Sequence, residues 1–398
     1  MNTPLLVRDF TDAEDLYNYS MGHLAHRWPD ARVRYRYVNR DRTHRFRAGF
    51  ARELRAQIEM LAELTFNDTA YDFFRATMPW LPESYVRWLR GYRFDPSQVV
   101  LEQEDGRLEL SIVGPWHEAI YWEIKLLATI SELSHVGPAT GELRDLPGGW
   151  EEHIHRKAER LSGAGAQWVD FGTRRRYSFE VQDAVVRIMK DYAGFRGTSN
   201  PYLARKHGVK AIGTYAHQLP MAMQVLHGAR DADRMAMVHW MDAYGAQLGI
   251  ALSDTLTTEH FLRSFDRDIA SRFQGVRQDS GDPFAFGERL IRHYESLGID
   301  PRTRVLVFSD NLNPELAVRL HEHFASRIRT TMGIGTNLTA DPAMTGVTPL
   351  NQVIKLIEAD FGNGPQPVVK LSDDVGKALG DAALIERIRL EIGWQAAQ

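Results

Sequence analysis

The feature that most constrains the fold is an alternation that begins at residue 165, where short apolar segments are each followed by a helical pattern. Strand-like patterns occupy residues 167–172, 210–215, 248–256, 273–283, 303–310 and 329–336. Helical patterns follow the first five of these segments, at residues 177–192, 217–227, 257–265, 284–298 and 314–325. This alternation predicts a parallel sheet, either open or closed into a barrel.

Polar residues follow these apolar segments, in the motifs DFGTRRR, GTSN, GTYAH, LSDT, RQDSGD, FSDN and GIGTN. Any one of these motifs could simply be a turn, because Gly, Asp, Asn and Ser favour turns. In barrels, however, the carboxyl ends of the strands carry the chemistry. The set as a whole, with arginine and histidine included, therefore predicts that the strand ends converge on one pocket.

The first part of the chain has a different pattern, which predicts helices and a hairpin rather than alternating strands and helices. Helices are predicted at residues 49–64, 84–92 and 114–133, a β-hairpin at 98–103 and 107–113, and a Gly/Pro-rich linker at 136–149. No segment approaches the ~18 uninterrupted apolar residues of a membrane helix. The first residues lack the pattern of a signal peptide. We therefore expect a cytoplasmic protein without a membrane span.

Composition excludes several kinds of chemistry. The 398 residues include no cysteine, so disulfides, thiolate catalysis and zinc–thiolate sites are excluded. The formal net charge is −4, which gives no sign of the basic excess that a nucleic-acid-binding surface needs. The length suits one large domain or two medium ones.

Several strand ends have the residue types of a site for phosphates. Gly333, Gly335 and Thr336 can present backbone N–H groups to a phosphate, and Asp310 ends the preceding strand. Three adjacent arginines, at residues 174–176, suit a polyanion such as pyrophosphate. Of these we expect Arg174 to face inward and Arg176 to be structural.

Carboxylates lie at two neighbouring strand ends. Asp279 and Asp282 accompany Arg277, and Asp254 belongs to LSDT. Such acids suit Mg²⁺ or ribose hydroxyls, and we expect the metal to be held mainly by substrate phosphates rather than by a protein cage. Asp282 precedes a proline, so it is better explained as a helix cap.

His217, in GTYAH, lies at a predicted helix start and has three possible roles. A histidine in this position is more often structural, and a metal-binding role lacks further ligands at a recognisable spacing. Beside a polyphosphate, a neutral imidazole can instead act as a nucleophile toward a phosphoryl group. Its unperturbed pKa near ~6.5 leaves much of it neutral at pH 7.

These motifs, in this order, resemble the nicotinate phosphoribosyltransferase family from about residue 11 to about residue 380. The helix GPWHEAIYWEIKLLA and the segments VIKLIE and KLSD–GK extend the resemblance. The resemblance implies a type II phosphoribosyltransferase fold. This fold is an irregular α/β barrel (residues 146–349) with a smaller α+β domain built from both chain ends (residues 1–145 and 350–398).

The resemblance also implies an activity. The ribose 5-phosphate of phosphoribosyl pyrophosphate would pass to nicotinate, giving nicotinate mononucleotide and pyrophosphate in NAD salvage. Mg²⁺ would be required, and ATP hydrolysis would be coupled to transfer through phosphorylated His217. The family is expected to be at least dimeric, with a tyrosine that matches Tyr17 reaching the site from the neighbouring subunit.

The residue roles that the resemblance implies fall into two sets. Catalytic roles are expected for His217, Arg174, Arg277 and Asp279. Substrate-binding roles are expected for Tyr17, Phe171, Thr198, Ser199, Asp254, Asp310, Gly333, Gly335 and Thr336. Phe171 and Tyr17 would stack on the pyridine ring. Ser199 would favour nicotinate, because the similar enzymes that use nicotinamide have an aspartate there, which would repel a carboxylate.

The sequence departs from the family pattern at five positions and leaves alternatives open. The departures are Asn18, Lys125, Gln218, Asp374 and Val375. The alternatives are a nicotinamide-using enzyme, a non-catalytic paralogue that binds nicotinate or its mononucleotide, and a barrel lyase or isomerase acting on a phosphorylated sugar. The last would typically need a Schiff-base lysine or a metal frame, and the motifs DFGT, GTSN, GTYAH, LSDT and DSGD contain no lysine.

Overall fold

The computed structural model describes residues 4–137, 140–374 and 378–394, in which the strands form a parallel sheet and an antiparallel sheet. The parallel sheet has the order β5-β4-β9-β8-β7-β6. Its strands are β4 (Trp168–Asp170), β5 (Phe195–Thr198), β6 (Ile250–Leu252), β7 (Gly275–Gln278), β8 (Val305–Phe308) and β9 (Arg329–Ile334). The predicted βα alternation is confirmed, and all the strand ends point to one edge.

Helices follow these strands as the sequence pattern predicts. They are α8 (Phe179–Met189), α9 (Pro201–His207), α10 (Gln218–His227), α11 (Ala229–Tyr244), α12 (Thr258–Ser264), α13 (Arg267–Arg272), α14 (Pro283–Ser296), α15 (Pro314–Phe324), α16 (Thr336–Thr339) and α17 (Pro342–Thr345), with 3-10 turns η2 (Thr173–Arg175) and η3 (Pro301–Thr303). Side-chain caps begin many of them. Asp282 accepts a hydrogen bond from the Ala285 N–H at 2.7 Å, which confirms its interpretation as a helix cap.

The strand predicted at residues 210–215 does not form. Ala211 makes an isolated bridge to Thr198, and Thr214 Oγ1 donates to the Ile250 carbonyl at 2.7 Å. A side chain at Gly213 would lie 3.0 Å from Leu16 Cβ, so this stretch packs closely against the chain's N-terminal part. The segment therefore connects the two outer strands, β5 and β6, without a regular ladder, which makes the barrel irregular.

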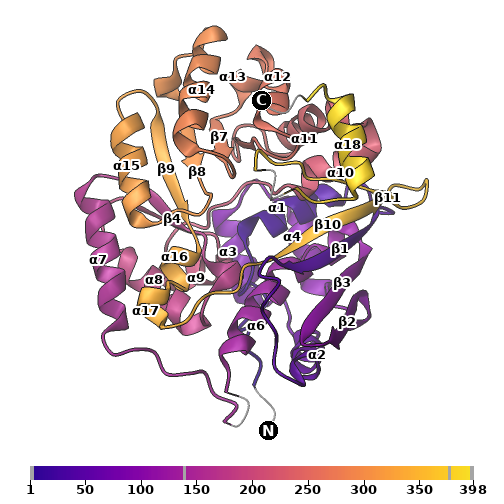
Figure 1. The fold of residues 1–398 in the computed structure, drawn as a ribbon, viewed down its shortest axis with the longest axis vertical. Helices are drawn as coiled ribbons and strands as arrows, with labels where there is room; N and C mark the ends of the chain where they lie inside the picture. Colours follow the sequence, from indigo (N-terminus) through magenta and orange to yellow (C-terminus); the bar gives the residue numbers. More distant parts are fainter. Residues whose placement is uncertain (1–3, 138–139, 375–377, 395–398) are drawn as a thin grey trace.

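The second sheet is antiparallel, in the order β11-β10-β1-β3-β2, and it joins the two ends of the chain. Figure 1 shows β10, coloured as a late segment, lying beside the early strand β1. The strands are β1 (Arg32–Asn39), β2 (Val99–Glu104), β3 (Arg107–Pro115), β10 (Gln352–Asp360) and β11 (Gln366–Pro367). The hairpin prediction is confirmed as β2 and β3. We did not predict β1, although the alternation of buried Val33, Tyr35 and Tyr37 with exposed arginines is a strand pattern.

The remaining helices surround this sheet and connect it to the parallel one. They are α1 (Leu16–Ala25), α2 (Phe50–Leu61), α3 (Asp68–Thr77), α4 (Glu83–Gly91), α5 (Trp116–Ala119), α6 (Trp122–His135), α7 (Trp150–Gly163) and α18 (Ala382–Glu391), with a 3-10 turn η1 (Pro96–Gln98). The prediction of a single helix over residues 114–133 is wrong. Residues 114–115 still belong to β3, pairing with β1, and the rest divides into α5 and α6. Almost all of α6 is buried, so it forms a central element of the core.

Candidate active site

A cavity of about 760 Å³ lies at the carboxyl ends of the parallel strands, and β10 contributes part of its wall. Ten of the predicted site residues line it: Tyr17, Phe171, Arg174, Ser199, His217, Arg277, Asp279, Asp310, Gly335 and Thr336. These residues come from positions spread over more than 300 residues of the chain. The expectation that the strand ends converge on one pocket is therefore met by the fold.

Three predicted site residues lie behind the cavity wall. Thr198 Oγ1 donates to Asp170 Oδ2 at 2.7 Å, so it supports the strand end. A Cβ on Gly333 would lie 2.5 Å from ring carbons of Phe171, so this glycine makes room for the phenyl ring. Asp254 is fully buried, and its Oδ1 lies 3.6 Å from His217 Nε2. Their positions suit support of the residues that line the cavity.

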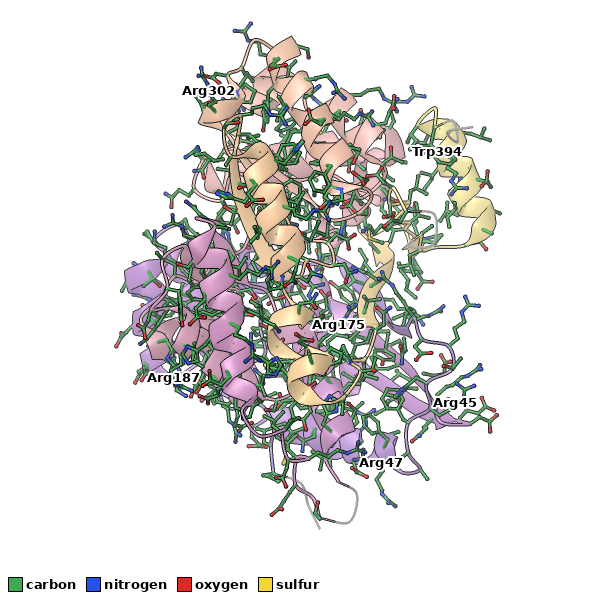
Figure 2. All side chains as sticks on the ribbon, turned by 60° about the vertical axis from the view of Figure 1, so that its left-hand side comes forward. Arg45, Arg47, Arg175, Arg187, Arg302 and Trp394 are labelled. Atoms are coloured by element: carbon green, nitrogen blue, oxygen red, sulfur yellow. The ribbon has the colours of Figure 1, made fainter. Side chains whose placement is uncertain are left out.

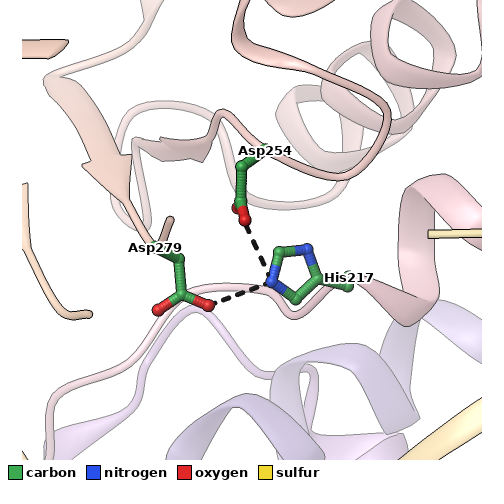
Figure 3. Close-up of side chains that lie close together, drawn as sticks. All are labelled: His217, Asp254 and Asp279. Atoms are coloured by element: carbon green, nitrogen blue, oxygen red, sulfur yellow. Dashed lines mark hydrogen bonds and ion pairs between the residues drawn. The ribbon is translucent and has the colours of Figure 1, made fainter. Parts of the chain in front are cut away.

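His217 lies at the start of α10, and acidic side chains surround its ring (Figure 3). Its Nε2 lies 3.0 Å from Asp279 Oδ2, and its Nδ1 lies 3.1 Å from Thr255 Oγ1. The Lys370 ammonium also lies 3.0 Å from Nε2, and it donates to Asp254 Oδ2 at 2.9 Å. Two carboxylates and a cation thus surround one nitrogen of the imidazole.

Burial keeps this imidazole neutral. The pKa of His217 falls to about 4 because the ring is buried and Lys370 lies beside it, although Asp254 opposes the shift. Burial disfavours ionisation of Asp279, but its hydrogen bond to His217 and the nearby Arg277 guanidinium hold its pKa well below the usual range. At pH 7 the group is thus a neutral imidazole beside ionised carboxylates, which suits a nucleophile.

The same residues could in principle hold a metal ion. Ligand atoms of His217, Asp254 and Asp279 lie within 4.8 Å of one another. The Lys370 ammonium contacts both the imidazole and Asp254, so a positive charge already balances part of the cluster. Asp279 also lines the cavity, so its carboxylate faces the space that a ligand would occupy.

The three adjacent arginines have three different roles. Arg174 and Arg175 line the cavity, which confirms that Arg174 faces inward. In Figure 2, Arg175 lies in the middle of the molecule, and it donates to the Gln352 carbonyl at 3.1 Å. Arg176 is fully buried away from the cavity, as predicted, and pairs with Asp12 and Glu132 at 2.6 and 2.7 Å.

Two aromatic rings line the cavity from a single chain. Phe171 follows β4, and Tyr17 lies in the first turn of α1. The Tyr17 hydroxyl donates to Glu123 Oε2 at 2.9 Å, and the Arg174 guanidinium lies 5.3 Å from the centre of its ring. The expectation that a neighbouring subunit supplies this tyrosine is therefore not needed to complete the site.

Ser199 also has a carboxylate neighbour, which sequence reasoning missed. Its hydroxyl donates to Asp15 Oδ1 at 2.6 Å, and Asp15 Oδ2 accepts from Arg174 Nε at 3.2 Å. Asp15 lines the cavity beside Ser199. The arginine therefore balances the charge of Asp15, and the serine occupies one of its oxygens.

The departures from the family pattern have identifiable contacts. Lys125 is buried, and its ammonium donates to the Phe10 and Asp12 carbonyls at 2.7 and 2.8 Å. Asn18 donates to Glu14, which also pairs with Lys125 at 3.3 Å, so the two changes meet at one carboxylate.

The remaining departures lie at or near the cavity. Gln218 donates to Glu123 Oε2 at 3.3 Å and accepts hydrogen bonds from Tyr35 and Trp116. Asp374 lines the cavity, and Val375 lies outside the described residues. The amide at position 218 lets this residue donate to Glu123, which a carboxylate could not do.

Sequence reasoning missed several further cavity residues. Glu123, Lys355 and Lys370 all line the cavity. Both lysines belong to segments that carried the resemblance, VIKLIE and KLSD, but neither received a role. A lysine within an otherwise apolar strand pattern is the signal that could have identified them, because burial of an ammonium group is costly.

The fold and the site define a class of protein: an α/β protein whose parallel strand ends bring glycine, cationic, acidic and histidine residues to one cavity. The nicotinate phosphoribosyltransferase family model matches residues 166–392, and the model of the family's N-terminal domain matches residues 13–131. The chain belongs to this family.

Individual relatives support this assignment over nearly the whole chain. A nicotinate phosphoribosyltransferase of Chromohalobacter salexigens is 42% identical over 377 residues, which cover 94% of this chain and 95% of that protein. The crystal structure of the Porphyromonas gingivalis enzyme matches with a TM-score of 0.92 at 36% identity, covering 97% of this chain and all of that one. A putative Saccharomyces cerevisiae enzyme matches with a TM-score of 0.91 at 30% identity, covering 99% and 100%.

Across the described residues, we find no helix of the length and apolar character needed to span a membrane.

Proposed function

We propose that this protein transfers the ribose 5-phosphate of phosphoribosyl pyrophosphate to nicotinate, with ATP hydrolysis coupled through His217. The observation that carries the proposal is the single cavity that unites Phe171 and Tyr17 with the phosphate-site residues Gly335 and Thr336 and with His217. One cavity thus contains rings that can stack on an aromatic base, groups that can bind the phosphate of a sugar, and a histidine that can accept a phosphoryl group. The names of the relatives support the same reaction.

In the transfer step, the pyridine nitrogen attacks the anomeric carbon while the bond to pyrophosphate breaks. Phe171 and Tyr17 would hold the ring between them, and Arg174 and Arg277 would face the leaving pyrophosphate. Fixing the ring in an attack geometry supplies much of the rate, and cations at the leaving group stabilise the charge that develops there. Gly335 and Thr336, with Asp310 nearby, would bind the 5-phosphate through backbone and hydroxyl donors.

Magnesium fits the donors of this cavity. The ionised Asp279 carboxylate lines it, and Asp310 lines it at the neighbouring strand end. A magnesium ion held there would supply positive charge to the phosphates of the leaving group. We propose that Asp279 is its main protein contact and that substrate phosphates supply most of its ligands.

The phosphohistidine step needs an unprotonated nitrogen on the cavity side. His217 Nε2 lies beside Asp279 and Lys370, both of which line the cavity, so this nitrogen is the nucleophile. The hydrogen bond to the Asp279 carboxylate requires a proton on Nε2, so the nucleophilic form gives up this bond and carries its proton on Nδ1, where Thr255 Oγ1 can accept it. Nε2 then bonds to the γ-phosphorus as the bond from phosphorus to ADP breaks, and water later removes the phosphoryl group.

The test is product formation by the purified protein with phosphoribosyl pyrophosphate and Mg²⁺, nicotinate or nicotinamide, and with or without ATP. Nicotinate-dependent mononucleotide with matching ADP release is the expected result. Product without ADP would remove the coupling step, and no product from either base would support a binding protein instead. His217→Ala should abolish ATP turnover and retain slow transfer; surviving ATP stimulation would assign the coupling to another residue.

Nicotinamide is the second candidate base, and the Asp15 carboxylate beside Ser199 is the observation that favours it, because a carboxylate can accept an amide N–H. Its pairing with Arg174 makes nicotinate the better candidate. A homodimer and a cytoplasmic location stay predictions.

A further inference from the structure

Two histidines outside the cavity bring their ring nitrogens together across the helices α10 and α11. His227 is the last residue of α10 and is exposed, and His239 lies on α11 and is half-buried. Their Nε2 atoms lie 3.3 Å apart. Neither residue takes part in the proposed transfer or in the phosphohistidine step, so the pair needs an explanation of its own.

The separation of the two nitrogens fits a shared metal ion better than a strong hydrogen bond. A hydrogen bond donated by an N–H group is most often about 2.9–3.0 Å long. Zinc binds imidazole nitrogen at about 2.0–2.1 Å, and at a tetrahedral angle two such bonds place their nitrogens about 3.3–3.4 Å apart. The pair therefore has the spacing of one edge of a tetrahedral zinc site.

Aromatic neighbours hold the His239 ring in place. Its centre lies 5.1 Å from that of the Trp28 ring, edge to face. Trp28 in turn stacks on Trp116, a fully buried residue, at 5.9 Å between ring centres. A side chain that is ordered before it binds a metal loses little conformational freedom on binding, so this packing favours affinity.

The charges near the pair also suit a metal ion. Burial, followed by the charges of His227 and Arg27, lowers the pKa of His239, and Asp242 opposes the shift. A lowered pKa keeps this imidazole neutral at pH 7, which is the form that binds a metal. The negative charge of Asp242 offsets the repulsion that Arg27 would exert on a bound cation.

We propose that His227 and His239 form a binding site for a divalent transition-metal ion such as Zn²⁺, which clamps the end of α10 to α11. Imidazole nitrogen suits zinc, copper and nickel, and water would complete the coordination, because the described residues bring no third histidine or carboxylate into range. The site is separate from the cluster around His217, which lies at the opposite end of α10. A bound ion would stabilise the folded protein, since the unfolded chain does not hold the two nitrogens together.

The experiment is isothermal titration of the metal-free, untagged protein with Zn²⁺, in the presence of excess Mg²⁺ to occupy sites with oxygen ligands. The proteins are wild type, His227→Gln, His239→Gln and the matched control His323→Gln, whose exposed histidine pairs with Glu288 instead of another histidine. We expect each variant of the pair to bind Zn²⁺ about 10- to 100-fold more weakly, because the second imidazole acts at a high effective concentration. The control should bind as wild type does.

Two further measurements locate the bound ion. The electron paramagnetic resonance spectrum of bound Cu²⁺ should show coupling to two imidazole nitrogens in wild type and to one in either variant of the pair. Zn²⁺ should raise the melting temperature of wild type more than that of either variant, and a chelator should reverse the rise.

Several results would overturn the proposal. Wild-type affinity for Zn²⁺ in both variants of the pair would place the metal elsewhere, and equal weakening in His323→Gln would mean that surface histidines bind it without specificity. A wild-type protein that binds no Zn²⁺ would leave the pair as a hydrogen bond between imidazoles only. If a variant does not fold, the nitrogen count of Cu²⁺ bound to wild type still decides, because coupling to a single nitrogen contradicts the paired site.

Discussion

Two of the buried clusters of charged side chains differ in whether the protein satisfies every charge. In the first, which we call the closed cluster, Arg176 donates to Asp12 through two nitrogens at 2.6 and 3.1 Å and to Glu132 at 2.7 Å. Glu132 also accepts from the Phe179 N–H at 3.0 Å. All three charged side chains are at most 1% exposed.

The second, which we call the open cluster, comprises His217, Asp254, Asp279 and Lys370. It borders the cavity, and 29% of the Asp279 side chain is exposed. Asp254 Oδ1 is buried without a hydrogen-bond partner among the described residues. The comparison teaches that charged side chains stabilise the fold where the protein satisfies all their hydrogen bonds. The same residue types are available for chemistry where a ligand must supply the missing partner.

The largest effect should come from breaking the closed cluster. Arg176→Met leaves Asp12 and Glu132 buried without their cation, so the free energy of unfolding should fall by about 3–5 kcal/mol. Urea unfolding measures this loss. The matched control is Arg302→Met, because Arg302 lies at the edge of the molecule (Figure 2) with 73% of its side chain exposed, and its pair with Asp300 should contribute under ~1 kcal/mol. Equal losses in the two variants would contradict the comparison.

The contribution of the open cluster to the free energy of unfolding should depend on pH. The pKa of His217 is about 4 in the folded protein, below the ~6.5 of an unfolded chain, so the unfolded state binds the proton first as pH falls. Stability that is present above pH 6.5 is therefore lost between pH 6.5 and 4, by roughly 2–3 kcal/mol from this residue. Urea unfolding at pH 7 and 4.5 should show a smaller pH dependence in His217→Gln than in wild type. An unchanged difference would place the titration elsewhere.

A charge introduced at the cavity edge should cost activity more than stability. Ser199→Asp would place a second carboxylate beside Asp15, whose Oδ1 accepts from the Ser199 hydroxyl at 2.6 Å, and would also repel the nicotinate carboxylate. We expect kcat/KM for nicotinate to fall about 100-fold, with a smaller loss for nicotinamide. Ser199→Ala, which removes the hydroxyl without adding charge, is the control. Equal losses for both bases would mean that the serine does not discriminate between them.

The sequence predicts the parallel sheet and most of the cavity lining because both follow from local patterns. An apolar strand followed by Gly, Asp or Arg is readable, and parallel strands bring their ends together. The sequence could not show that residues 210–215 form only a bridge, since Gly213 must approach α1 closely. Nor could it pair Ser199 with Asp15 or Lys370 with His217, because those contacts join segments more than 150 residues apart.

The smallest effect should come from the residue that orients the open cluster without touching the substrate. Thr255 is fully buried, and its Oγ1 lies 3.1 Å from His217 Nδ1. Thr255→Val keeps the shape but removes the acceptor that favours a proton on Nδ1, so the nucleophilic tautomer loses about 1 kcal/mol of preference. ATP turnover should fall roughly 5- to 10-fold while ATP-independent transfer is unchanged. Thr255→Ser, which restores the hydroxyl, should recover the coupling. A loss in which both activities fall together would instead mean that Thr255 supports the packing of the cavity rather than the tautomer of His217.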